Sequence, residues 1–206
     1  MNKTIQFECQ RCGLCCQTKF LCLYPLELNK AKLYAKNFEI KLQFEPLRKI
    51  LEEKHQKIII FIYRLIQRPC PFFSDSRCLI QEKKFIACRK YPISNWIDLG
   101  KVFRFLGFNN EFYDVDDNCT FIKNHDVFKI ALRNLPLSSI LTKEYEAILE
   151  DKKIWLDLNH QFTLLKKEHK IKVINEQKLK KSNLEMYQEI LNSWEQISAI
   201  EFLKHV

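Results

Sequence analysis

The sequence predicts an α+β fold: a small, irregular, cysteine-rich domain with short strands and helices, followed by a helical C-terminal extension. Three observations lead to this class. All nine cysteines fall within the first 119 of the 206 residues. Short helix-like and strand-like patterns alternate along the chain, and a helix-period pattern follows a capping signal near its end. We therefore expect a cysteine-cluster domain over residues 1–124 and an α/β extension over residues 125–206, ending in an amphipathic helix.

The first domain is expected to contain only short elements. Pro25 suits the first turn of a helix, and the β-branched and aromatic run 58–63 is typical of a buried strand. Tyr91-Pro92 ends any helix before it. In chain order we expect a cysteine loop at 7–20, a helix at 25–37, a strand at 38–44, a short helix at 47–55, a buried strand at 58–63, helical turns at 83–90, a strand at 102–107 and a turn at 114–118.

The C-terminal extension carries a different pattern. Apolar residues alternate with polar ones from Ile154 to Leu164, which predicts a strand or hairpin, and the lysine-rich segment 166–172 is expected to be a solvated turn. Ser182 and Glu185 have the spacing of a capping box. From Leu184 to Ile200 the apolar residues then recur at helical spacing, so the final amphipathic helix should cover this range.

Several function classes are excluded by composition. The three glycines, Gly13, Gly100 and Gly107, are too far apart for a dinucleotide-binding or phosphate-binding glycine loop. The longest uncharged run, 134–142, is much shorter than a membrane-spanning helix, so no membrane association is expected. The first residues have no apolar segment typical of a secretory signal, and we therefore expect a cytoplasmic protein.

The positive charge of the chain lies with its cysteines. Of the formal net charge of +9, residues 1–124 contribute 21 Lys and Arg against 13 Asp and Glu. The lysines and arginines are scattered and form no basic block, which argues against nucleic acid as a partner. Thiolates around a metal add negative charge that this count omits, so part of the basicity is expected to compensate the site. The expected partner is a metal ion or cluster, and a protein partner is left open.

The cysteine pattern itself predicts metal binding. Cys9, Cys12, Cys15 and Cys16 fall within eight residues, and two-residue spacing lets neighbouring thiolates reach one thiophilic metal. Gly13 is expected to take a positive φ that turns the loop between ligands. Because neighbouring side chains diverge, the loop can serve two adjacent sites or one cluster with extra thiols.

The spacing leaves the identity of the metal open. It resembles the start of a ferredoxin run, but Lys19 occupies the position of the fourth cysteine. No histidine pair has zinc-finger spacing. Zinc and an iron–sulfur cluster, including the 4Fe–4S type, remain the two candidate cofactors.

Four short motifs, in order, resemble the YkgJ family of zinc- or iron-chelating cysteine-cluster proteins. The motifs are Phe7-Glu-Cys-Gln-Arg-Cys-Gly-Leu-Cys-Cys16, Cys70-Pro-Phe-Phe73, Cys78-Leu-Ile80 and Cys88-Arg-Lys-Tyr-Pro92. The family includes the flagellin lysine methylases, so the resemblance also implies an alternative function as a cluster-dependent group-transfer or redox enzyme. It implies as metal ligands Cys9, Cys12, Cys15, Cys16, Cys70, Cys78, Cys88 and Cys119.

Two cysteines depart from the family pattern. The family often continues its last cysteine with Pro-Gly, whereas Cys119 is followed by Thr120-Phe121. Cys22 lies outside the motifs, and we expect it to be a buried free thiol. Arg89, beside Cys88, is expected either to donate to a sulfur or to form a surface ion pair.

The remaining chemistry-bearing residues point to no further site. The five histidines are scattered and are expected to have structural or surface roles, His125 being the first candidate for a site because it follows Cys119. The acidic segment 114–118 lacks the glycine and the closing glutamate of a calcium loop. No nucleophile triad can be assembled, and catalytic residues stay unassigned.

Overall fold

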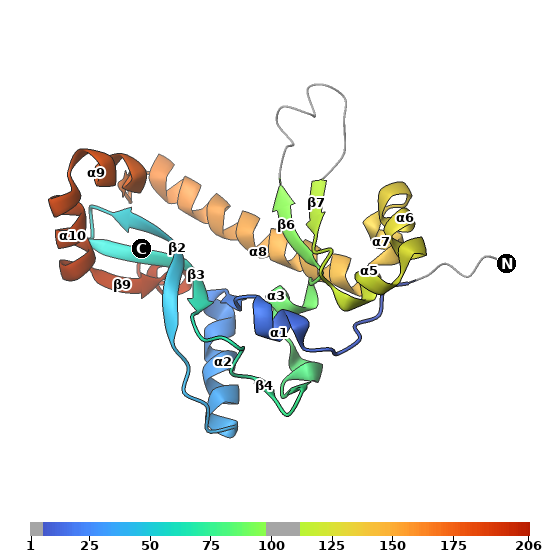
Figure 1. The fold of residues 1–206 in the computed structure, drawn as a ribbon. Helices are drawn as coiled ribbons and strands as arrows, with labels where there is room; N and C mark the ends of the chain where they lie inside the picture. Colours follow the sequence, from blue (N-terminus) through green and yellow to red (C-terminus); the bar gives the residue numbers. More distant parts are fainter. Residues whose placement is uncertain (1–5, 98–111) are drawn as a thin grey trace. The chain divides into compact units, whose positions relative to one another are not determined.

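The computed structural model describes residues 6–97 and 112–206, which form two compact units (Figure 1). The first unit combines residues 1–19 with 68–152, and the second combines 20–67 with 153–206. The division differs from the boundary expected after residue 124, because segment 20–67 leaves the cysteine-bearing part of the chain to join the C-terminal segment. The α+β class, with a helical C-terminal region, is confirmed. The strand expected at 102–107 lies outside the described residues.

The first unit contains short elements around the cysteines. They are α1 (Leu14–Thr18), β4 (Phe73–Ser74), β5 (Arg77–Cys78), a 3-10 turn (Gln81–Lys83), α3 (Ile86–Arg89), β6 (Ile93–Ile97), β7 (Phe112–Val115), α5 (Thr120–Asn124), α6 (Asp126–Asn134), α7 (Leu137–Ile140) and the start of α8 (Thr142–Lys167). β4 pairs with β5, and β6 pairs with β7, both antiparallel. The helical turns expected at 83–90 correspond to α3, and the turn expected at 114–118 follows β7.

A compact apolar core supports these elements. It is built from α5 to α8 together with β6, and consists of Ile93, Cys119, Phe121, Ile122, Phe128, Ile140, Leu141 and Ile148. The Phe7 ring packs against Phe121 at 5.0 Å between ring centroids, and the Phe7 amide donates to the Ile140 carbonyl at 2.9 Å. The segment that enters the cysteine loop is therefore anchored two residues before Cys9.

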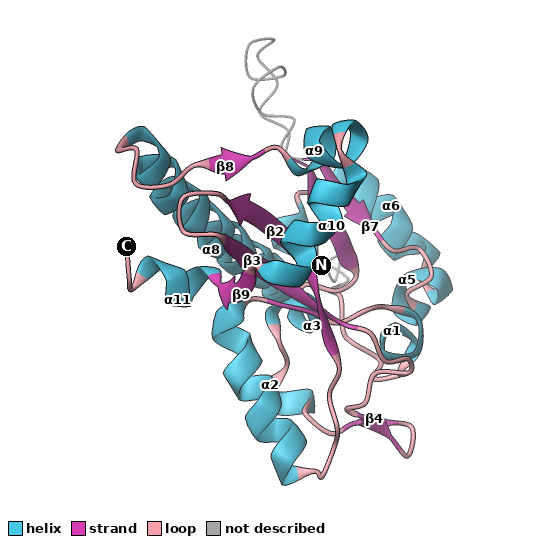
Figure 2. Cartoon of the chain, turned by 90° about the vertical axis from the view of Figure 1, so that its left-hand side faces the viewer, coloured by secondary structure: helices cyan, strands magenta, loops and turns pink. Residues whose placement is uncertain are grey.

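The second unit is a five-stranded sheet with helices on it (Figure 2). Its elements are β1 (Cys22–Leu23), α2 (Pro25–Asn37), β2 (Phe44–Glu52), β3 (Lys57–Leu65), the rest of α8, β8 (Val173–Ile174), α9 (Glu176–Ser182), α10 (Leu184–Ser193), β9 (Glu195–Ser198) and α11 (Ala199–Leu203). β3 pairs with β1 and β2 antiparallel and with β9 parallel, and β8 extends β2. The predicted helix 25–37 and the buried strand 58–63 are confirmed.

The two faces of β3 bury different partners, because alternate side chains point to opposite faces of a strand. Ile58 joins Leu51, Tyr187 and Ile190 in a cluster under α10. On the other face, the Phe61 ring packs against Phe162 of α8 at 4.7 Å between ring centroids. This double burial explains why the strand reads as a continuous apolar run.

Two predicted elements next to β3 were wrong. The expected helix 47–55 is the strand β2, and the expected strand at 38–44 is a loop until Phe44. A fully buried strand needs hydrogen-bonding neighbours, and residues 44–52 supply the antiparallel ladder for β3. The sequence pattern around Leu47 fits a helix as well as a strand, and the sheet pairing decides between them.

The expected strand at 154–164 was also wrong, since α8 continues through it to Lys167. The residues that alternate as apolar in the sequence of this segment are not all buried in the structure. Leu158 and Phe162, four residues apart, are buried, whereas Leu156 and Leu164 are about half exposed. A helix places residues four apart on one face, which is the pattern that the structure uses. Among the described residues, no helix has the length and apolar character needed to cross a bilayer.

The final helix begins at Leu184 as expected, but it is shorter and its N-cap lies one residue later than predicted. Asn183, and not Ser182, is the N-cap of α10: its side-chain oxygen accepts from the Met186 amide at 2.9 Å. The helix ends at Ser193, and residues 195–198 instead form β9 beside β3. Ile197, which was predicted to lie in the helix, therefore lies in a strand that pairs with β3.

The corrected cap gives a direct test of α10. Replacing Asn183 by alanine removes the acceptor of the Met186 amide and should lower the free energy of unfolding by about 1 kcal/mol. Ser182→Ala is the matched control and should change it by less than about 0.5 kcal/mol, as exposed substitutions usually do. Chemical denaturation of both variants measures the difference. Equal effects would contradict the assignment of Asn183 as the cap.

Candidate metal centre

Eight of the nine cysteines lie in the first unit, and all nine are free thiols. They come from several separate segments: Cys9 and Cys12 precede α1, Cys15 and Cys16 lie in α1, Cys70 precedes β4, Cys78 lies in β5, Cys88 lies in α3 and Cys119 is the N-cap of α5. These are the eight residues expected as metal ligands. The fold therefore brings the sequence motifs into one unit although up to 110 positions separate them.

Gly13 turns the chain between the two halves of the first motif. Its φ of 73° is left-handed, as predicted, and it forms the N-cap of α1. A Cβ atom at this position would lie 2.3 Å from two ring carbons of Phe73, three residues after Cys70. Only glycine allows both the turn and this close approach. Cys9 and Cys12 thus lie before the turn, and Cys15 and Cys16 lie on the helix after it.

Cys15, Cys16, Cys70, Cys78 and Cys88, which we call the inner thiol group, interact with one another. The Cys16 thiol shifts the pKa of both Cys15 and Cys78. The Cys70 amide donates to the Cys16 carbonyl at 2.7 Å. The hairpin of β4 and β5 places Cys78 opposite Phe73, the residue that packs on Gly13. Backbone pairing therefore holds three sequence motifs together at α1.

The thiols of the inner group differ in pKa. The hydrogen bond from Cys16 lowers the pKa of Cys15 to about 7 and that of Cys78 to about 6, although burial acts in the opposite direction. The same hydrogen bonds raise the pKa of Cys16, so this thiol keeps its proton. Because the thiolate is the form that binds metal, Cys15 and Cys78 are ready to act as ligands near neutral pH.

Cys70 and Cys88 complete the inner group and are half-buried like its other members. Burial raises the pKa of Cys70 to about 11 and raises the pKa of Cys88 well above its ordinary value. Negative charge at Cys15 and Cys78 adds to both shifts. As anions these sulfurs would repel one another, and a thiophilic cation is the kind of charge that offsets such repulsion.

Cys9, Cys12 and Cys119, which we call the outer thiol group, are linked through the start of α5, where Cys119 is the N-cap. The Thr120 hydroxyl donates to the Cys12 sulfur at 3.1 Å. Burial raises the pKa of Cys119, and negative charge at Cys12 and Cys9 raises it further. Cys9 and Cys12 are exposed, whereas Cys119 is only 7% exposed. The late cysteine that departs from the family pattern therefore still joins the others.

Lys84 is a cation that contacts one of these cysteines. Its Nζ lies 3.7 Å from the Cys9 sulfur, and its positive charge lowers the pKa of Cys15 and Cys78 after the larger effects of Cys16 and burial. Neither Lys84 nor Thr120 could be identified from the sequence. Each simply lies near a cysteine, and scattered lysines elsewhere in the chain look the same.

Other residues singled out in the sequence have different roles. Cys22 belongs to the second unit and is half-buried rather than buried, with its sulfur 3.9 Å from the Phe20 carbonyl. Arg89 forms an ion pair with Glu150, which is the second of its two expected roles. His125 donates through Nδ1 to the Phe121 carbonyl at 2.7 Å and stacks on the Phe121 ring. None of these contacts involves the inner or the outer thiol group.

Within residues 6–97 and 112–206, no three histidine, cysteine, aspartate or glutamate side chains already form the arrangement of an assembled metal site. Hydrogen bonds and charge relate the thiols to one another instead. The chain matches no family model, no curated protein and no solved structure. Its function must therefore be inferred from its own residues.

Proposed function

We propose that this protein is a metal-binding protein that coordinates zinc or an iron–sulfur cluster through the cysteines of the inner and outer thiol groups. The cytoplasm, which keeps thiols reduced, is the compartment that suits nine free cysteines. Bound zinc would contribute folding energy, and an iron–sulfur cluster would in addition carry electrons. The order of the cysteine motifs, which resembles that of the YkgJ family, agrees with this proposal.

The observation that carries the proposal is the backbone arrangement that gathers three cysteine motifs at one turn. The Cys70 amide donates to the Cys16 carbonyl at 2.7 Å, and Cys78 lies opposite Phe73, whose ring packs on Gly13. The pKa of Cys15 is lowered to about 7 and that of Cys78 to about 6, first by the Cys16 thiol, so thiolates suited to a metal form there near neutral pH. Soft thiolate donors suit zinc and iron–sulfur clusters better than magnesium or calcium.

Ordinary core packing explains these cysteines less well. A structural cysteine is usually fully buried, inert and apart from other thiols. In the first unit, Cys9 and Cys12 are exposed and five others are half-buried, so seven of the eight thiols gain little from apolar burial. Their gathering in one unit is better explained by a ligand that several sulfurs bind.

Metal and sulfide analysis of the protein purified without oxygen tests the proposal. We expect either zinc alone, in a colourless protein that chelator destabilises, or iron and acid-labile sulfide, in a brown protein that dithionite bleaches. Cys22→Ser should retain the full metal content, whereas the double variant Cys16→Ser, Cys78→Ser should lose metal. A wild-type protein with neither metal and nine titratable thiols would overturn the proposal.

A further inference from the structure

We propose that this protein forms a twofold homodimer through its second unit, in which the basic face of α2 from each chain packs into an apolar groove, with an acidic edge, of the other chain. The groove has a volume of about 620 Å³, and all the residues that line it belong to the second unit. The inference is independent of the proposed metal binding, because it involves none of the eight cysteines of the first unit.

The lining of the groove is mainly apolar. Most of it consists of aliphatic side chains, among them Leu158 and Leu165 of α8 and Leu203 of α11. Leu26 of α2 and Leu164 of α8 also line it, and they are 40% and 41% exposed. A hollow of this size with apolar walls is typical of a binding site, and the exposed leucines are stabilised when a partner covers them.

The exposed edge of the groove on α8 carries two carboxylates. Four exposed residues recur there after four, three and four positions, which places them on one side of the helix: Asp157, Gln161, Leu164 and Glu168. The Glu168 amide donates to the Leu164 carbonyl at 2.9 Å, so the helical path reaches Glu168. At about 1.5 Å per residue, this set, which we call the acidic row, is about 16 Å long.

The cations near the acidic row leave it negative. Lys204 lines the groove as well, so two carboxylates face one ammonium group there. Glu168 pairs with Lys170 at 3.2 Å, but both side chains are about half exposed, and an exposed ion pair of this kind is easily exchanged. Asp157 has no ion pair within the part of the chain that the structure describes. The groove therefore suits a partner face that is both apolar and basic.

The exposed face of α2 has this character. It presents a row with the same spacing as the acidic row: Leu26, Lys30, Leu33 and Asn37. Leu33 is 56% exposed, although it lies in the middle of the helix. Lys36 lies beside the row and is exposed too, whereas the acidic residue of α2, Glu27, is buried. We call the four residues together with Lys36 the basic face.

The groove and the basic face adjoin each other in one chain, because Leu26 belongs to both. A twofold axis uses such adjoining surfaces together: each chain offers its basic face to the groove of the other and receives the basic face of the other in its own groove. Both surfaces are then buried twice, which gives the large area that a stable dimer needs. A helix from a different protein in the groove would leave the basic face uncovered, so a second copy of this chain is the occupant that accounts for both surfaces.

Sedimentation velocity of the full chain over a range of concentrations tests the inference, with a reductant present to prevent disulfides between chains. We expect the wild type to dimerise. Two charge-reversed variants, Lys30→Glu with Lys36→Glu and Asp157→Lys with Glu168→Lys, should each raise the dissociation constant at least about tenfold, because like charges then face each other at both contacts. Lys178→Glu with Lys181→Glu reverses two exposed lysines of α9, outside the groove and the basic face, and is the matched control. It should dimerise within about twofold of the wild type.

A mixture of the two charge-reversed variants gives the most specific result. In a mixed dimer, one contact keeps the original lysines and carboxylates, and the other contact has both exchanged, so opposite charges face each other at both. We expect the mixture to dimerise nearly as well as the wild type, although neither variant does so alone. This recovery would also show that both variants are folded.

Three outcomes would overturn the inference. The first is a wild type that stays monomeric at every concentration, and the second is a dimer that both charge-reversed variants leave intact. The third is a loss of the dimer in each variant without recovery in the mixture, since the basic face and the groove would then not contact each other. The variants should keep the metal content of the wild type, so each of these outcomes leaves the proposed metal binding unaffected.

Discussion

Replacing Gly13 by alanine is expected to weaken metal binding at least tenfold. The residue has a φ of 73°, where an L-residue with a side chain costs about 1–2 kcal/mol. The new Cβ would also lie 2.3 Å from two ring atoms of Phe73, and overpacking of this kind adds about 1–3 kcal/mol. Since about 1.4 kcal/mol is a tenfold change in affinity, either contribution alone is measurable in a metal titration.

A double variant separates the two contributions. Gly13→Ala combined with Phe73→Leu removes the ring that the new methyl group meets but keeps the strained φ. We expect it to recover part of the affinity that Gly13→Ala loses, whereas Phe73→Leu alone should bind metal within about threefold of the wild type, as a volume-reducing change at a half-buried site allows. Wild-type affinity in Gly13→Ala would show that the turn does not position the thiols.

The elements that sequence reasoning identified correctly have strong local signals. Pro25 opens α2 at its first turn, and the β-branched run in β3 is buried on both faces. Both signals depend on a few neighbouring residues, so they indicate the local structure without knowledge of distant parts of the chain. The positive φ of Gly13 was likewise predictable, because the spacing of the cysteines leaves little other use for a glycine there.

The elements that failed depend on partners far along the chain. β2 forms because β3 needs a neighbour, and residues 195–198 leave the helical pattern because the other edge of β3 is open to them. The same limit applies to the candidate site. The motifs pointed to the eight cysteines, but only the fold brings Thr120 to Cys12 and Cys70 to Cys16.

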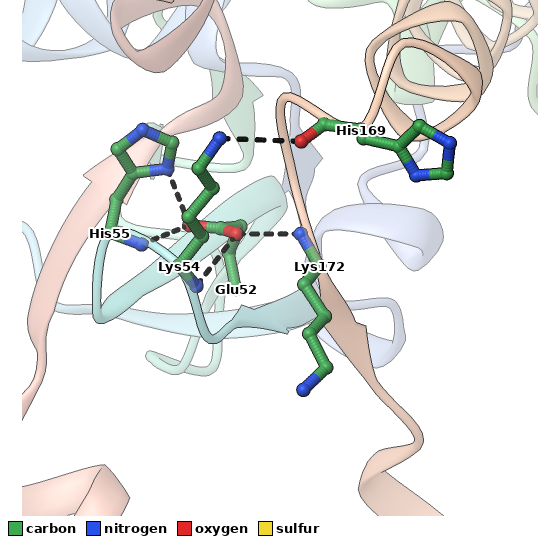
Figure 3. A network of polar contacts seen from close by, with 5 residues as sticks. All are labelled: Glu52, Lys54, His55, His169 and Lys172. Carbon is green, nitrogen blue, oxygen red and sulfur yellow. Dashed lines mark hydrogen bonds and ion pairs between the residues drawn. The ribbon is translucent and has the colours of Figure 1, made fainter.

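Glu52 is a buried acidic group of the second unit that holds several backbone amides. Its carboxylate is fully buried and accepts from the Lys54 amide at 3.0 Å, from the His55 amide at 2.8 Å and from the Lys172 amide at 2.8 Å (Figure 3). The His55 ring lies 2.8 Å from it. One side chain therefore closes the turn after β2 and ties it to the segment that leads into β8.

Substituting Glu52 by glutamine should lower the free energy of unfolding by about 2–4 kcal/mol. The amide keeps the shape but replaces one acceptor by a donor that faces other N–H groups, and hydrogen bonds to a buried charge are worth more than neutral ones. Glu53→Gln is the matched control next in sequence. Glu53 pairs with the Lys172 ammonium at 2.9 Å on the surface, so its loss should cost at most about 1 kcal/mol.

The difference in unfolding free energy between the wild type and Glu52→Gln should depend on pH, which a loss of packing alone would not cause. Burial acts to raise the pKa of Glu52, but the Lys172 and His55 amides, the His55 ring and the Lys54 amide hold it below its ordinary value. A carboxyl group whose pKa is lower in the folded state contributes its full stabilisation of the fold at pH values above its unfolded pKa of about 4.3. That stability is lost as pH falls through the lower, folded-state value.

Urea denaturation of the wild type and of Glu52→Gln at several pH values measures this directly. The gap between their unfolding free energies should be constant from neutral pH down to about pH 5 and should narrow below about pH 4.3, because the protonated glutamic acid has lost the same charge as glutamine. A gap that stays unchanged to lower pH would mean that Glu52 stabilises the turn by shape alone. Equal losses in Glu52→Gln and Glu53→Gln would refute its special place among the acidic residues of this segment.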